Sequence, residues 1–139
     1  MSITDTARDF FDACETGKGW AACSAWCHPD ASFACQSDAL ADTTTLEAYT
    51  EWMKGLVGGP LPDGRYTLHS SAWDEANSTA TFVATFHATH KGEGGPVAAT
   101  NKATNTDYVY SVKMNGDGKV ASMTKIWNDG YALAELGWA

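Results

Sequence analysis

The sequence predicts an α+β fold in which a curved antiparallel sheet wraps around helices and leaves a cone-shaped cavity. The first half of the chain carries apolar side chains at helical spacing, whereas the second half alternates apolar and polar residues with a period of two. Turn signals separate the alternating segments. Helices followed by a meander of strands are typical of α+β proteins. The length of 139 residues fits one domain over residues 1–139.

The first predicted helix has an apolar stripe with the spacing i, i+3, i+4, i+7. The stripe consists of Ala7, Phe10, Phe11 and Cys14. Ser2 or Thr4 can cap the start of this helix, and Gly17 ends it. A second, short helix is predicted over 18–26 and stops at His28-Pro29, because the residue before a proline is pushed out of the helical region.

A short strand is predicted over 31–36, with Phe33 and Cys35 on one face. The next helix begins at an apparent capping box, in which Thr44 and Glu47 satisfy each other's backbone amides. Its apolar stripe consists of Leu46, Tyr49, Met53 and Leu56. Gly58-Gly59-Pro60 ends it.

The second half predicts four long strands and a closing helix. The strands span 65–73, 79–90, 104–114 and 119–128. A turn over 74–77, a loop over 91–101 and the hairpin signal Asn-Gly-Asp-Gly at 115–118 connect them. The last helix is predicted over 129–136 and ends at Gly137.

Composition excludes several classes of function. The formal net charge of −8 argues against nucleic-acid binding, because phosphate backbones repel an acidic surface. No apolar run is long enough to span a membrane and no secretory signal is visible, so we expect a cytoplasmic protein whose 4 cysteines are buried thiols. Cys23, Cys27 and His28 lack a second pair at ligand spacing, so we expect no metal site.

Several segments resemble the SnoaL-like polyketide cyclases, a family of the nuclear-transport-factor-2-like superfamily. They are His87–Pro96, Gly118–Val120, Met123–Asp129, Leu133–Trp138 and Trp26–Ala31. The resemblance implies a cone-shaped α+β barrel with an apolar pocket and no cofactor. It also implies a homodimer packed through the sheet. The same scaffold carries ketosteroid isomerase, scytalone dehydratase and limonene epoxide hydrolase, so the fold alone does not define a reaction.

The sequence departs from the family pattern at two places. Ala99-Thr100-Asn101 stands where the family often has Pro-Thr-Gly. Asn128 stands at or beside the place of the acidic residue of the cyclases, with Asp129 adjacent. An amide cannot act as a proton-transfer base, so either Asp129 takes that role or the cyclase acid–base chemistry is missing.

The candidate catalytic residues are Asp107, Asp129 and His90. A carboxylate in an apolar cavity has a raised pKa, which suits proton transfer next to a carbonyl. Asp107 has an alternative role as the ion-pair partner of a neighbouring lysine such as Lys125, and Asp129 as a helix cap. His90 titrates near neutrality if exposed, although a lone histidine at a strand end is often a surface residue.

The candidate substrate-binding residues are mostly aromatic, since large rings line pockets for apolar ligands. They are Trp52, Tyr49, Tyr108, Lys125, Trp127 and Asn128. Strand parity groups Asp107 with Val109 and places Tyr108 on the other face. Both faces carry bulky apolar groups, so the sequence does not say which face lines the pocket.

Two functions remain open from the sequence. The first is a cyclase-, isomerase- or dehydratase-like enzyme that uses acid–base chemistry on a small, largely apolar carbonyl compound. The second is a module on the same scaffold that binds a small apolar or aromatic ligand, or dimerises, without catalysis.

Overall fold

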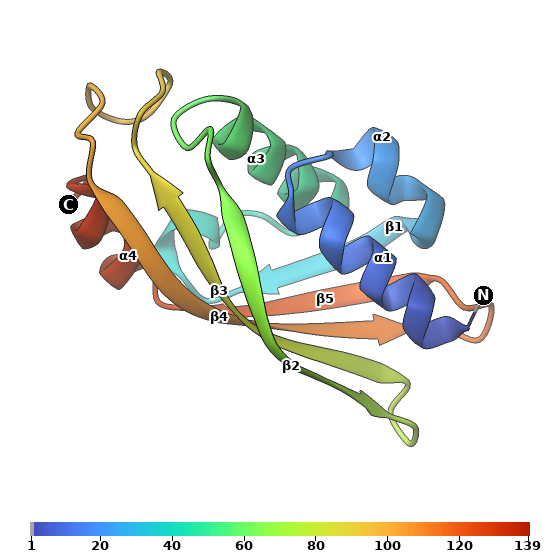
Figure 1. Ribbon diagram of the computed structural model, residues 1–139. Coiled ribbons are helices and arrows are strands. Elements are labelled where there is room, and N and C mark those ends of the chain that lie inside the picture. The colour runs from blue at the N-terminus through green and yellow to red at the C-terminus, as the bar shows by residue number, and fades with distance from the viewer. Residues whose placement is uncertain (1) are drawn as a thin grey trace.

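A computed structural model describes residues 2–139. Figure 1 shows a curved sheet of five strands with three helices lying over one face and a fourth helix at the C-terminal end. The elements are α1 (Ile3–Glu15), α2 (Trp20–Cys23), η1 (Ser24–Trp26), β1 (Cys27–Cys35), η2 (Asp38–Leu40), α3 (Leu46–Gly58), β2 (Arg65–Asp74), β3 (Thr79–Thr89), β4 (Ala103–Met114), β5 (Val120–Trp127) and α4 (Asp129–Leu136). None of the helices described is long and apolar enough to cross a bilayer.

The sheet has the strand order β1-β5-β4-β3-β2. Strands β2 to β5 form an antiparallel meander, as the sequence predicts, and the sheet does not close into a full barrel. The predicted α+β cone is therefore confirmed, with one refinement. Strand β1 pairs with β5 in parallel, so the sheet is mixed.

Helix α1 forms as its sequence pattern predicts. Its Ser2 cap accepts a hydrogen bond from the amide of Asp5 at 3.1 Å, and the Asp5 side chain accepts one from the amide of Ser2 at 3.3 Å. The apolar stripe faces the sheet, where Phe10 and Phe11 are fully buried. The helix ends before Gly17, whose φ of 74° is a left-handed conformation that glycine adopts without steric cost.

The start of α3 corrects the predicted capping box. Thr45, not Thr44, is the cap: its hydroxyl accepts a hydrogen bond from the amide of Ala48 at 3.1 Å. Thr44 is committed elsewhere, because its carbonyl accepts a bond from the amide of Phe33 in β1 at 2.9 Å. This bond to β1 holds the segment that leads into α3, so the cap lies one residue later than the sequence predicts.

Strand β1 begins four residues earlier than the predicted 31–36, at Cys27. The pairing of β1 with β5 is irregular between Cys27 and Ser32, and Pro29 lies inside that irregular stretch. A proline has no amide to donate, so it is tolerated in an edge strand where the ladder is interrupted. The short helix predicted over 18–26 is present as α2 followed by η1.

The inner face of the sheet packs against α1 and α3 and forms the core. Phe11 of α1 stacks on Phe82 of β3 with ring centroids 4.5 Å apart. It also meets Tyr66 of β2 and Tyr110 of β4 edge-on, at 5.0 Å and 5.4 Å. These pairs fix α1 across three strands, and α1 carries Glu15 in its last turn.

Phe11→Ala should destabilise the protein by about 3–5 kcal/mol, because it removes a fully buried ring and leaves a cavity. Urea denaturation of the wild type and the variant measures the change. Val97→Ala is the matched control: Val97 is 48% exposed, and its truncation should change the free energy of unfolding by less than about 0.5 kcal/mol. Equal losses in both variants would contradict the assignment of Phe11 to the core.

Candidate functional site

An apolar cleft of 230 Å³ lies at the end of the molecule that carries α4 and the C-terminus. Its walls come from α3, α4, the loop after β3 and the inner faces of β3, β4 and β5. The lining residues are Ala39, Trp52, Leu56, Leu61, Phe86, Pro96, Thr104, Thr106, Trp127, Ala132, Leu133, Leu136 and Trp138. Apart from the hydroxyls of two threonines, these side chains offer apolar surface. The cleft therefore suits a small, largely apolar ligand.

A smaller cavity of 30 Å³ lies behind the cleft, deeper in the cone. Four side chains line both spaces and stand between them: Trp52, Leu56, Phe86 and Trp127. The rest of the small cavity is formed by Glu15, Met53, Tyr108 and Lys125. Its volume matches one water molecule or one polar group of a ligand. The small cavity thus brings a carboxyl, a phenol and an amine together next to the apolar cleft.

Glu15 lies in the last turn of α1 and is only 2% exposed. Its Oε2 atom is buried without a hydrogen-bond partner. Burial raises the pKa of this carboxyl above its usual 4.5, and the positive charge of Lys125 and the nearby hydroxyls of Tyr110 and Tyr108 oppose that rise without cancelling it. A glutamate with a raised pKa can both take and release a proton closer to neutral pH.

Lys125 reaches the cavity from β5 and is 5% exposed. Its Nζ donates a hydrogen bond to the Tyr49 hydroxyl at 3.0 Å, and that hydroxyl is bonded in turn to the hydroxyl of Tyr110. The Nζ atom lies 4.1 Å from the ring centroid of Trp127 and 5.5 Å from that of Trp52. Burial lowers the pKa of the amine, and the nearby charge of Glu15 only partly restores it.

Tyr108 is the third polar group of the cavity. Its hydroxyl is buried and makes no hydrogen bond of full geometry, although the Glu15 carboxyl lies close enough to interact with it. Burial, together with the negative charge of Glu15, raises the pKa of this phenol, so it stays protonated and able to donate. An unpaired buried polar atom costs about 1–3 kcal/mol, which marks Tyr108 and Glu15 as groups that a ligand or a water would satisfy.

Four of the predicted binding residues line this cavity, and a fifth, Tyr49, contacts Lys125 beside it. Tyr49, Trp52, Tyr108, Lys125 and Trp127 lie on α3 and on the inner faces of β4 and β5. Sequence reasoning missed Glu15. The signal was present, because Ala7, Phe11 and Glu15 follow one another at intervals of four along the buried stripe of α1.

Asp107 does not join the cavity. It lies on the outer, solvent-facing side of β4, where Oδ1 accepts a hydrogen bond from the Thr85 hydroxyl at 2.6 Å. The alternative pairing of Asp107 with Lys125 does not occur, because strand parity places the two side chains on opposite faces of the sheet. The catalytic role predicted for Asp107 stays a prediction without a place in the site described here.

Asn128 and Asp129 lie at the start of α4, outside the small cavity. The Asn128 side chain accepts a hydrogen bond from the amide of Tyr131 at 3.1 Å and so caps the helix. Asp129 accepts bonds from the amides of Ala39 and Gly130, each at 2.9 Å. The cap is therefore Asn128, and Asp129 lies in the first turn of α4, where its carboxylate accepts bonds from two other backbone amides.

His90 is fully buried at the base of the loop that follows β3. Its Nδ1 accepts a hydrogen bond from the indole N–H of Trp138 at 2.8 Å, which assigns the proton of the neutral ring to Nε2. The Thr100 amide also donates to Nδ1, at 3.3 Å. His90 therefore holds the loop and the C-terminus together beside the cleft and does not reach the small cavity.

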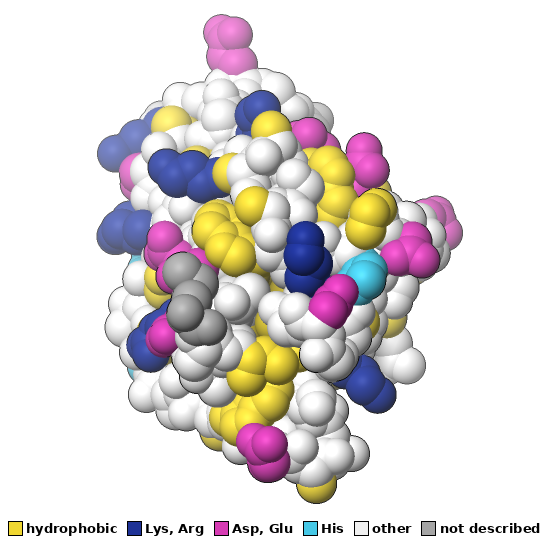
Figure 2. Space-filling view, turned by 90° about the vertical axis from the view of Figure 1, so that its right-hand side faces the viewer, with side chains coloured by type: hydrophobic (Ala, Val, Ile, Leu, Met, Phe, Trp, Pro, Cys, Tyr) yellow, Lys and Arg dark blue, Asp and Glu magenta, His cyan; other side chains and the backbone are white. Residues whose placement is uncertain are grey.

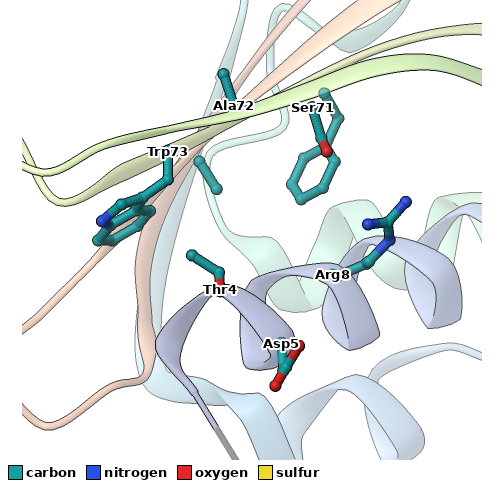
Figure 3. A pocket seen from close by; sticks show the side chains of 8 residues that line it. Thr4, Asp5, Arg8, Ser71, Ala72 and Trp73 are labelled. Atoms are coloured by element: carbon teal, nitrogen blue, oxygen red, sulfur yellow. The ribbon is translucent and has the colours of Figure 1, made fainter.

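A second hollow of 290 Å³ lies at the opposite end of the cone, between the start of α1 and β2. Figure 3 shows Thr4 and Arg8 of α1 on one side and Ser71 and Trp73 of β2 on the other. Hydrophobic patches are interspersed with charged side chains on this end (Figure 2). The hollow is wide and lacks converging buried polar groups. Residues 2–139 contain no cluster of three His, Cys, Asp or Glu side chains suited to a metal ion.

A family model described as the SnoaL-like domain matches residues 7–123. The chain belongs to the SnoaL-like domain family. No curated protein sequence matches the chain. The resemblance that the sequence indicates is confirmed, and the cleft and small cavity occupy the inside of the family's cone.

Solved structures show the same fold. IdmH of Streptomyces antibioticus, proposed to be a polyketide cyclase, is 17% identical with a TM-score of 0.77 and covers 99% of both chains. AclR of Streptomyces galilaeus, proposed to be a hydroxylase, is 20% identical with a TM-score of 0.74 over 99% of this chain and 88% of its own. A hypothetical protein of Catenulispora acidiphila with a ketosteroid isomerase-like fold is 16% identical with a TM-score of 0.69, over 99% of this chain and 94% of its own. Such low identities establish the fold and no reaction.

Glu15→Gln tests the environment of the buried carboxyl. Because folding raises the pKa of Glu15, its stabilising contribution is complete below the ordinary pKa of 4.5 and is lost as the pH rises through the folded value. The wild type should therefore lose stability relative to the glutamine variant as the pH rises from 4.5. Urea denaturation of both proteins, at steps of roughly one pH unit between pH 4 and pH 8, measures this difference in the free energy of unfolding.

Glu51→Gln on the exposed face of α3 is the matched control, and its difference from the wild type should not follow this course. A Glu15→Gln curve parallel to that of the wild type would show that Glu15 titrates as it does in the unfolded chain.

Proposed function

We propose that this protein is a cofactor-independent enzyme of the cyclase or isomerase type that moves a proton on a small, largely apolar carbonyl compound. One observation carries the proposal. Two buried polar atoms without partners, Glu15 Oε2 and Tyr108 Oη, belong to side chains that line the same small cavity at the end of an apolar cleft. A general acid–base group and a hydrogen-bond donor that converge on one point are the minimum that such a reaction needs.

The cleft and the small cavity would hold different parts of the ligand. The apolar body would lie in the cleft against Trp52, Phe86 and Trp127, which also form the entrance of the small cavity. The carbonyl oxygen would enter the cavity, whose volume of 30 Å³ admits one polar group. There the oxygen would accept a hydrogen bond from the Tyr108 hydroxyl, which otherwise has only the Glu15 carboxyl close by.

The residues then divide the chemistry. Ionised Glu15 would take a proton from the carbon next to the carbonyl and return it elsewhere on the product. Tyr108 would stabilise the enolate oxygen with a hydrogen bond, and the positive charge of Lys125 would favour the same negative charge. Water is largely excluded from the site, so these interactions are stronger than they would be at a surface.

Membership of the SnoaL-like family supports an enzyme of this type, as does the structural similarity to IdmH, itself proposed to be a polyketide cyclase. The second candidate is a module that binds the same ligand without turnover, for which the mostly apolar lining of the cleft is the favouring observation. The two candidates differ in one measurable property: only the enzyme should accelerate exchange of the α-protons of a bound ketone.

Benzylacetone, a methyl ketone with an aromatic tail, is a suitable probe. In deuterated buffer the wild type should accelerate exchange of its α-protons, as followed by NMR. Glu15→Gln should reduce the enzymatic rate by about 10²–10⁴-fold, because the proton-transfer group is lost. Tyr108→Phe should reduce it by about 10²–10³-fold, since it removes the donor to the enolate oxygen.

Glu51→Gln is the control. Because Glu51 is exposed, this variant should accelerate exchange of the α-protons as much as the wild type does. Asp107→Asn decides between the two carboxyls. If Asp107→Asn abolished exchange while Glu15→Gln did not, the assignment of Glu15 would be overturned. Binding of benzylacetone without any accelerated exchange would favour the non-catalytic module.

A further inference from the structure

The amine of Lys125 is placed differently from an ordinary buried lysine. A buried ammonium group is normally paired with a carboxylate, because an isolated charge in the interior is costly. Within residues 2–139, Lys125 forms no such ion pair; its hydrogen-bond partner is the neutral hydroxyl of Tyr49 at 3.0 Å. Its side chain also lines the small cavity that the proposed function assigns to a carbonyl group.

We propose that Lys125 is a nucleophile that forms an imine with the carbonyl carbon of the ligand. The proposal rests on the proposed function only for the entry of a carbonyl compound into the cavity. It adds a covalent step, and it narrows the ligand to aldehydes and unhindered ketones, whose carbon an amine can attack.

The step is balanced without any cofactor. The lone pair of Nζ forms a bond to the carbonyl carbon, and the carbonyl oxygen takes a proton from the carboxyl of Glu15 to give a carbinolamine. Nζ returns a proton to Glu15, which passes it to the hydroxyl group. The C–O bond then breaks, and water leaves as the C=N bond forms. Overall, one neutral amine and one carbonyl give one protonated imine and one water, and Glu15, which begins as a carboxyl, ends as the carboxylate.

The surroundings of Lys125 favour its neutral, nucleophilic form. The titratable groups that influence it are Glu15 and Cys14 on α1 and Cys35 on β1, and tyrosines 49, 108 and 110 also face it. Desolvation lowers the pKa of Lys125 more than these groups raise it. A buried amine with a lowered pKa is neutral, and therefore nucleophilic, in a larger fraction of molecules at neutral pH.

The aromatic side chains suit the product as well as the amine. Trp127 and Tyr49 face Nζ, with their ring centroids at 4.1 Å and 5.1 Å. A protonated imine is a cation at the same place, so it would keep the attraction of these ring faces. The rings also limit the entry of water, which would hydrolyse the imine.

Reductive trapping tests the proposal. The wild-type protein is incubated with benzylacetone and sodium cyanoborohydride at pH 7, and the adduct is located by intact mass and peptide mapping. Among the lysines, we expect the secondary-amine adduct at Lys125 alone, because its amine lines the cavity that the ketone would enter and burial lowers its pKa. Lys125→Arg and Lys125→Met should lose the adduct, since neither side chain is a nucleophilic amine.

Lys113→Met is the matched control, because Lys113 is exposed on the outer face of β4; this variant should retain the adduct. Lys125→Met replaces the amine by an apolar side chain of similar length and should fold, as thermal unfolding would verify. Peptide mapping locates the adduct in the wild-type protein, so this part of the test does not depend on whether any variant folds. An adduct spread over the exposed lysines, or no adduct while benzylacetone still quenches tryptophan fluorescence, overturns the proposal.

The two proposals fail separately. Proton exchange without an adduct rejects the imine and leaves the acid–base function. An adduct at Lys125 without proton exchange rejects the acid–base function and leaves the imine. Absence of binding, exchange and adduct rejects both.

Discussion

The structure depends on one constraint: a carboxyl and an amine are buried in the same apolar interior without pairing. Glu15 and Lys125 come from opposite sides of the cone and are 2% and 5% exposed. Burial moves their pKa values towards each other, upwards for the carboxyl and downwards for the amine. The Lys125 amine donates a hydrogen bond to the Tyr49 hydroxyl, which is bonded in turn to the Tyr110 hydroxyl on β4. The deep end of the cone is therefore a polar site that the fold tolerates at some cost in stability.

Strand parity decides which residues share this site. On β4 and β5, alternate residues point into the cone, so Tyr108, Lys125 and Trp127 are neighbours while Asp107 faces outwards. The grouping by parity could be predicted from the sequence. The choice between the two faces could not, because bulky side chains occur on both and only the packing of α1 and α3 decides which face is inside.

The elements themselves were largely predictable because their signals are local: the apolar stripes of α1 and α3, the alternation along β2 to β5 and the turns between them. Long-range features were less accessible. The parallel pairing of β1 with β5 joins segments about 90 residues apart and leaves no local pattern. Glu15 was missed because a charged residue at the end of an apolar stripe is ordinarily a solvated one, and only the cone built around α1 buries it.

The unpaired atoms of Glu15 and Tyr108 connect stability with function. A fold selected for stability alone would gain by replacing the buried carboxyl and amine with apolar groups of similar volume. The Phe11 contacts that anchor α1 to β2, β3 and β4 compensate for that cost by fixing the helix that carries Glu15. A ligand that brings a carbonyl oxygen into the cavity would supply a partner to Tyr108 Oη and a reacting centre to Glu15 and Lys125. Part of its binding energy would then come from polar contacts with these side chains, so the ligand should bind by its carbonyl group as much as by its apolar body.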